Sequence, residues 1–270
     1  MAGFASLADL RTEAFTNGKV FRYDFTKTSS APEAAGVLHS LWTAAGAPAA
    51  GSNPSGFPGA ACTNLAGSIN FPDTSPDLKY LATITVTSTL DCGLLLLDRL
   101  SHASGWNLTN GGAQAVSTTA LPRYTDGVGV QCYCEVTTVT ATNAVVARMS
   151  SYTDDGNNTG QNGVNRTFPA AATNAGCFIG PMNLNSGDSG VRAVAEITQD
   201  TAASAGAGNL VLAKPIAFMG LRANQSRCLN FFIESATMPR IYDGASLMFA
   251  IWPTGTSAVT ISGRIEVVYG

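Results

Sequence analysis

The clearest pattern in the sequence is a regular alternation of apolar and polar residues at positions 79–90. A period of two places successive side chains on opposite faces of an extended chain, so this segment is predicted to be a half-buried antiparallel strand. Residues 93–98 form a continuous apolar run, which indicates a fully buried strand or the start of a helix. The apolar face of the first strand is expected to carry Tyr80, Ala82, Ile84 and Val86.

Strand patterns continue through the rest of the chain. Residues 128–141 and 144–153 are two strand-like runs joined by a polar corner at Thr142–Asn143, which predicts a hairpin without the favoured Asn-Gly pair. The polar segment 154–166 contains four Asn and three Gly and is expected to be an exposed loop. Further strands are predicted at 176–180, 191–199, 209–217, 227–234, 247–252 and 258–269.

Two helices are predicted near the N-terminus. Residues 6–16 begin with Ser6 as a possible cap and place Asp9 near the positive end of the helix dipole. Residues 32–45 form the second candidate, with Pro32 suited to the first helical turn. The apolar stripe of the first helix consists of Leu7, Leu10 and Phe15.

A segment rich in Gly, Pro and Ser at positions 46–60 has no periodicity and is the best internal boundary. It divides the chain into an N-terminal helical arm and linker, residues 1–50, and a body, residues 51–270. A single domain overall remains an alternative. Many short strands and few helices predict a mainly β protein, with an antiparallel β-sandwich or jelly-roll-like body and one or two short N-terminal helices.

Charged residues make up 12% of the chain, against roughly 25% in an ordinary soluble domain. Free domains usually carry more surface charge to stay dispersed, so much of this surface is expected to be covered in an assembly. Secreted β proteins rich in Thr and Asn can be equally poor in charge. The net charge of −3 and the scattered arginines argue against a nucleic-acid partner.

The N-terminal sequence has neither a basic segment nor an apolar run of the secretory type, and no window is long enough to span a bilayer. Synthesis in a cytoplasm and free thiols are therefore expected. Cys132 and Cys134 would share one strand face and are interpreted as core thiols rather than metal ligands. Asp154–Asn157 resembles the opening of a calcium loop but lacks the later ligands. No metal or cofactor is predicted.

Candidate catalytic groups are few. Residues 187–190, Gly-Asp-Ser-Gly, match the string around the nucleophilic serine of chymotrypsin-like proteases. Neither His39 nor His102, however, lies in the sequence context that those proteases use for the histidine. The string is interpreted as a turn in which Asp188 accepts hydrogen bonds from backbone amides. The protein is therefore expected not to be an enzyme. The isolated carboxylates that could form a glycosidase pair are Asp98, Asp126, Glu135, Glu196 and Glu234.

The three tryptophans are interpreted as core or interface residues rather than as a sugar platform. Trp252 follows an apolar run and is expected in the core, whereas Trp106 is expected at a loop tip or subunit contact. The residues predicted to form subunit interfaces are Phe4, Leu7, Leu10, Phe15, Trp42 and Trp106.

Short strings lie along the chain at 40–46, 80–82, 98–102, 121–124, 129–130, 151–156 and 188–192. Together they resemble a loosely defined set of tailed-bacteriophage virion structural proteins. They look like the joints of a shared β scaffold and transfer no catalytic role. In the Asp-Arg-Leu-Ser-His string, Arg99 and His102 are expected to bond neighbouring carbonyl groups.

The resemblance implies a component of the virion, such as a capsid decoration (cement) protein or a related head or tail component, assembled in the cytoplasm of a host bacterium. The expected partners are other virion proteins, first the major capsid protein, and further copies of this chain, with a trimer as the first expectation. No membrane partner is expected. The alternative is a glycan- or receptor-binding β-sandwich module of a phage tail, which would require a site with two or more exposed aromatic residues.

Overall fold

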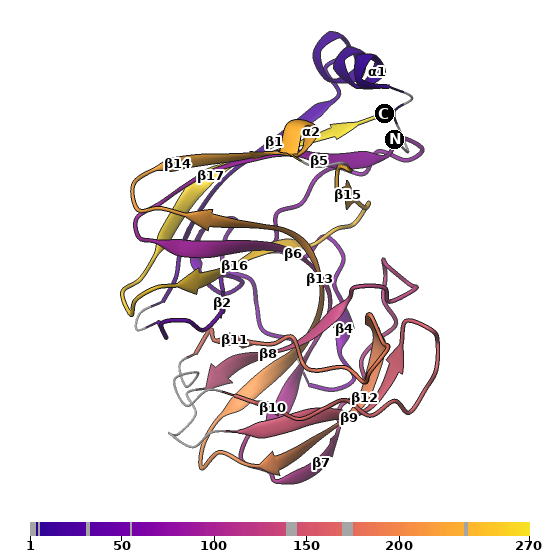
Figure 1. Ribbon diagram of the computed structural model, residues 1–270, viewed down its shortest axis with the longest axis vertical. Coiled ribbons are helices and arrows are strands. Elements are labelled where there is room, and N and C mark those ends of the chain that lie inside the picture. Colours follow the sequence, from indigo (N-terminus) through magenta and orange to yellow (C-terminus); the bar gives the residue numbers. More distant parts are fainter. Residues whose placement is uncertain are drawn as a thin grey trace.

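The computed structural model describes residues 4, 6–30, 33–54, 56–138, 145–168, 175–234 and 237–270. The fold is mainly antiparallel β, as predicted, and its strands form three sheets in a sandwich-like body (Figure 1). Sheet A lies at the top of the view, sheet B crosses the middle and sheet C lies at the bottom. Gly270 at the C-terminal end lies next to Phe4 and to Glu13 of the N-terminal helical segment.

Sheet A has the strand order β14-β5-β17-β1-β3, with β15 beside β5. Its strand β1 pairs with β17 over nine residues and with β3 on its other side. The bounds are β14 Ser226–Asn230, β5 Lys79–Ser88, β17 Thr260–Tyr269, β1 Val20–Thr28, β3 Ala45–Ala47 and β15 Arg240–Ile241.

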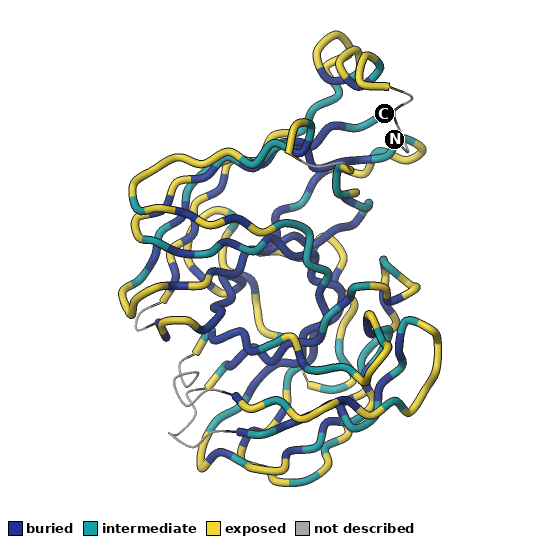
Figure 2. The backbone as a smooth tube through the Cα atoms, in the orientation of Figure 1, coloured by how far each residue is buried: buried dark blue, intermediate teal, exposed yellow. Residues whose placement is uncertain are grey.

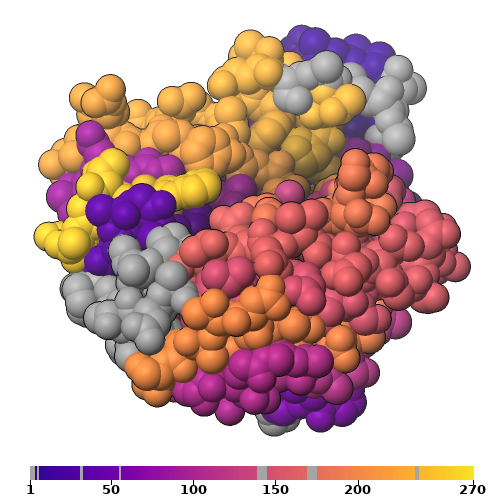
Figure 3. Space-filling view, turned by 60° about the horizontal axis from the view of Figure 1, so that its bottom comes forward, coloured from indigo at the N-terminus to yellow at the C-terminus, as the bar shows by residue number. Residues whose placement is uncertain are grey.

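Sheet B has the order β11-β8-β13-β6-β16-β2, with β4 beside β6, and sheet C has the order β10-β9-β12-β7. In sheet B the bounds are β11 Phe178–Ile179, β8 Gln131–Thr138, β13 Ala207–Leu221, β6 Cys92–Asn107, β16 Leu247–Pro253, β2 His39–Ser40 and β4 Ala60–Ala61. In sheet C they are β10 Arg166–Thr167, β9 Val146–Asp154, β12 Val191–Thr201 and β7 Gly112–Ala115. The strands of sheet C lie side by side on the face that Figure 3 brings forward.

The long strands β6 and β13 join the two ends of the molecule. Leu94 and Leu96 of β6 pack in one core cluster with Ile84 of sheet A. Leu100, further along the same strand, packs in another cluster with Met149 of sheet C. One pair of strands therefore contributes to two cores, and Figure 2 shows the buried backbone concentrated along it.

The opposite face of sheet B is also covered. Leu97 and Val211 pack there against Leu38 and Trp42 from the N-terminal part of the chain. A strand buried on both faces has no polar side to alternate with, which explains the continuous apolar run at 93–98. The prediction of a buried strand at that run is confirmed.

The alternating segment 79–90 is also confirmed as a strand, β5, and its predicted apolar face is buried. The six strands predicted after residue 175 all occur, although the one expected at 227–234 ends at Asn230 and gives way to the short helix α2, Phe231–Glu234. The helix predicted at 6–16 is confirmed as α1, Leu7–Arg11, followed by a π-helical turn η1, Thr12–Thr16. Ser6 caps it by accepting the amide of Asp9.

The second predicted helix, 32–45, is wrong. Its described part is a turn followed by β2 and a further turn, and Pro32 lies outside the described residues. The backbone here bonds to other strands: the carbonyl of Leu38 accepts from Phe178, and the amide of Leu41 donates to Phe249. These long-range bonds replace the local bonds a helix would make. Strand β1 likewise makes residues 20–28 part of sheet A rather than a helical arm.

The predicted hairpin between 128–141 and 144–153 is wrong as well. Both strands exist, but β8 pairs with β11 and β13 in sheet B, whereas β9 pairs with β10 and β12 in sheet C. The corner at Thr142–Asn143 lies outside the described residues. The polar segment 154–166 is a loop between the end of β9 at Asp154 and the start of β10 at Arg166.

Within the described ranges, no helix is long and apolar enough to cross a membrane.

Candidate interaction surface

The protease-like string does not build a catalytic serine site. Ser189 is exposed, and its hydroxyl donates to the carboxylate of Asp155 at 2.6 Å while its amide donates to the same carboxylate at 3.0 Å. Asp188 accepts from the hydroxyl of Tyr152. The predicted turn is therefore held by Asp155, and the role assigned to Asp188 was wrong.

Both histidines are buried and held by other groups. The Nδ1 atom of His102 accepts from Arg99 at 3.1 Å, and the Nε2 atom of His39 accepts the amide of Ala34 at 2.9 Å. Burial lowers the pKa of each imidazole to about 4. These side chains are neutral parts of the core near neutral pH.

A buried network of charged residues replaces the expected carbonyl contacts of the Asp-Arg-Leu-Ser-His string. Arg99 of β6 bonds both carboxylate oxygens of Glu135 on β8, at 2.9 and 3.2 Å. Arg123 bonds both oxygens of the neighbouring Asp98, at 2.7 and 2.9 Å. Burial alone would raise the pKa of Glu135, but the charge and hydrogen bonds of Arg99 outweigh it and hold that pKa below its usual value. The two carboxylates therefore serve ion pairs within the core.

The other glycosidase candidates also have structural partners. Glu196 accepts from the hydroxyl of Ser150 at 2.7 Å, and Asp126 accepts the amide of Val128 at 3.2 Å.

Over the part of the chain that the structure describes, no three side chains of His, Cys, Asp or Glu gather as a metal-binding set.

The six residues predicted to form interfaces divide into two groups. Leu7 and Phe15 on the N-terminal helix are 58% and 82% exposed and remain candidates for contacts with another molecule. The other four are buried within the chain. Trp106, expected at a loop tip, lies in the core beside Phe168 and donates to Gln199 at 2.5 Å. The buried four are Phe4, Leu10, Trp42 and Trp106.

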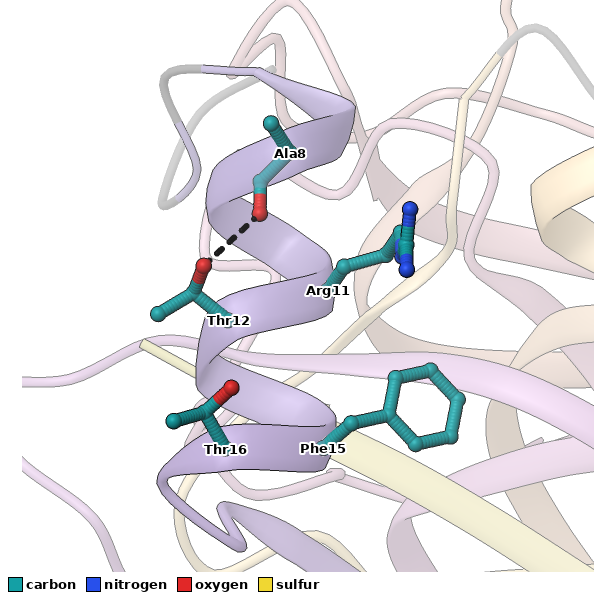
Figure 4. A pocket seen from close by; sticks show the side chains of 5 residues that line it. All are labelled: Ala8, Arg11, Thr12, Phe15 and Thr16. Atoms are coloured by element: carbon teal, nitrogen blue, oxygen red, sulfur yellow. Dashed lines mark hydrogen bonds between the residues drawn. The ribbon is translucent and has the colours of Figure 1, made fainter.

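An apolar groove lies between the N-terminal helix and α2. Leu10 and Ala14 face the body of the protein, and Leu7 and Phe15 form the outer wall on the helix side. Because residues four apart lie on one side of a helix, Arg11 and Phe15 project together, as Figure 4 shows. The cavity measures about 200 Å³. Together, Leu7, Leu10, Arg11, Ala14, Phe15, Asn230, Phe232 and Ile233 are called the N-terminal groove.

The opposite wall of the groove was not predicted. Ile233 of α2 is 82% exposed and faces the groove next to Phe232. The signal in the sequence is the run Phe231–Ile233, since three consecutive apolar residues cannot all face inward on a strand with one buried face. In Figure 3 the indigo helix lies at the margin of the molecule next to amber atoms of the C-terminal third.

A second exposed apolar surface lies on sheet B. Trp252 was expected in the core but is 45% exposed, and Phe218 on β13 is 57% exposed. Gly93 of β6 lies between them, directly opposite Trp252 in the register and close to the ring of Phe218. The Nε1 atom of Trp252 donates to the carbonyl of Gly36 at 2.7 Å, which fixes the indole ring. We call Phe218, Gly93 and Trp252 the aromatic face.

Comparisons with known proteins do not assign a family. No family model and no curated protein matches the sequence. A solved structure of a mutant VP2 protein of infectious bursal disease virus, in derived T=1 particles, aligns over 96% of this chain and 82% of that chain, with 8% identity and a TM-score of 0.17. A likeness of this size carries no argument about fold or function.

Proposed function

We propose that this protein is a non-enzymatic structural component of a phage particle, namely a decoration protein that contacts the major capsid protein and other copies of itself. The observation that carries the proposal is the N-terminal groove. Its walls expose Leu7, Phe15 and Ile233 together at one end of the molecule. Exposed apolar residues that lie next to one another indicate a site of contact with another protein.

The composition supports the same proposal. The chain has few charged residues, and several of them are used in buried ion pairs such as Arg99–Glu135 and Arg123–Asp98. Fewer charged side chains therefore remain on the surface to keep the protein dispersed in solution. A protein whose surface is covered by neighbours tolerates this composition better than one that stays alone in solution.

The test is binding of the purified chain to phage heads that lack it, measured by co-sedimentation. The expected result is saturable binding at a stoichiometry that matches the symmetry of the head. Phe15→Ser should weaken this binding at least tenfold, a loss of about 1.4 kcal/mol. Val164→Ser is the matched control, because Val164 is 57% exposed in a different part of the molecule. Heads that bind none of the chain would contradict the proposal.

The aromatic face favours a second candidate, a glycan- or receptor-binding module. The ring of Phe218 packs over Gly93 beside Trp252, so two partly exposed aromatic side chains lie next to each other, and a sugar ring could stack on them. A sugar-array screen of the intact chain tests this function. Binding that Trp252→Ala abolishes and Phe15→Ser does not would support the second candidate over the first.

A further inference from the structure

We propose that the N-terminal groove receives the same groove of a second copy of this chain, so that two copies pair about a two-fold axis. This inference rests on the proposed function, because it names the partner at the surface that carries that proposal. It is a narrower statement, since a capsid protein could also occupy the groove.

The first argument is the shape of the patch, which combines projections with a hollow. Phe15 and Ile233 project from its two walls, each 82% exposed, and the cavity of about 200 Å³ lies between them. In a two-fold contact the same surface of both copies forms the interface. Each contact between one residue of the first copy and another residue of the second copy therefore occurs twice. Here Phe15 of one copy enters beside Ile233 of the other, and the reverse contact forms at the same time.

The second argument is charge. Arg11 on the helix side of the groove is exposed and forms no ion pair with any described residue. Glu234 at the end of α2 is also exposed, and its carboxylate accepts only the amide of Asn230 at 3.1 Å among the hydrogen bonds of the described chain. A two-fold axis that runs along the groove brings the helix side of one copy opposite the α2 side of the other. Each Arg11 then meets the Glu234 of its partner at the rim of an apolar contact.

Apolar centres with charged rims are the usual anatomy of protein interfaces, and rim charges select the correct partner and orientation. A patch with only apolar residues would fit many partners. The pairing of one cation with one anion across the axis favours a second copy of this chain.

The experiment measures the mass of the full-length chain by light scattering over a range of concentrations. The expected result is a reversible dimer of twice 27.8 kDa. Arg11→Glu and Glu234→Arg should each weaken the dimer about tenfold or more, because each places like charges opposite one another, and the double variant should restore it. Phe15→Ser should also weaken it. Arg227→Glu is the control, because that arginine is exposed, forms no ion pair with any described residue and lies outside the groove.

Each outcome decides between defined alternatives. A chain that stays monomeric at all concentrations and still binds phage heads overturns the pairing and leaves the proposed function standing. A dimer that the double charge exchange restores, but that binds no heads, supports the pairing and contradicts the proposed function. A dimer unaffected by Phe15→Ser, or a trimer, overturns the two-fold contact through the groove. Circular dichroism of every variant confirms that these exposed substitutions leave the fold intact.

Discussion

The guanidinium group of Arg99 lies 4.7 Å from the centre of the Trp42 ring, on the face of sheet B that the N-terminal part of the chain covers. Trp42 thus closes over the ion pair that Arg99 makes with Glu135. The indole nitrogen is fixed in turn by the carbonyl of Ser52 at 2.9 Å. Residues before and after position 50 therefore pack as one unit around a buried charge pair.

We expect Glu135→Gln to lower the free energy of unfolding by about 3 kcal/mol, because it leaves the buried charge of Arg99 without its partner. Asp24→Asn is the control, since it breaks the exposed pair Asp24–Arg264 and should lower the free energy of unfolding much less. Urea unfolding of the two variants and the parent measures both values. Equal effects of the two substitutions would contradict the assignment of Arg99–Glu135 as a buried pair.

Gly51 is expected to be intolerant of substitution. A methyl group at this position would clash with the indole ring of Trp42, which is itself buried. Gly51→Ala should therefore destabilise the protein by about 1–3 kcal/mol through overpacking. Gly255 has open space around it, so Gly255→Ala should change the stability little. Thermal unfolding compares them, and a neutral Gly51→Ala would show that the Trp42 ring is free to move.

Strands with one solvent-exposed face were predicted well from the sequence. In β5 the period of two is visible because Thr87 faces solvent while Val86 is buried. No such period exists at 38–42, where Leu38, His39, Leu41 and Trp42 are all buried by strands distant in the sequence. Helical propensity was the remaining local signal there, and long-range packing overrode it.

The candidate surface was predictable only in part. The stripe of Leu7, Leu10 and Phe15 identified the right helix, but sheet A decides which side is covered, and only Leu10 is buried. Ile233 was missed because the second wall is distant in the sequence. The prediction that Arg99 bonds neighbouring carbonyl groups was wrong for the same reason, since its partner Glu135 lies on another strand of sheet B.

Thiol reactivity gives a further prediction. All six cysteines are free, five are buried and Cys228 is exposed on the edge strand β14. Burial raises the pKa of Cys62 to about 11 and suppresses its thiolate. A thiol titration should find one fast-reacting group in the native protein and six after unfolding. Cys228→Ser should remove the fast group, and a second fast thiol in the native protein would contradict the core placement of the others.

The pH dependence of the free energy of unfolding should show the titration of the Glu33 carboxyl. Its Oε1 atom accepts from the hydroxyl of Ser29 and from the amide of Val259 at 3.2 Å, and its Oε2 atom is buried without a hydrogen-bond partner in the described chain. Burial raises the pKa of this carboxyl from 4.5 to about 7. The folded state then binds more protons than the unfolded state between these values. This contribution to stability is full below pH 4.5 and is lost as the pH rises through about 7.

His39 and His102 act in the opposite direction, because burial lowers their pKa from 6.5 to about 4 and their contribution is lost as the pH falls. The effect of Glu33 must therefore be measured as a difference. Glu33→Gln keeps an oxygen acceptor but cannot ionise, so the variant should gain stability relative to the parent as the pH rises from 4.5 to about 7. Urea unfolding of both proteins across this range gives the difference, in which the histidines cancel. A difference that does not change with pH would mean that Glu33 is already ionised in the folded protein.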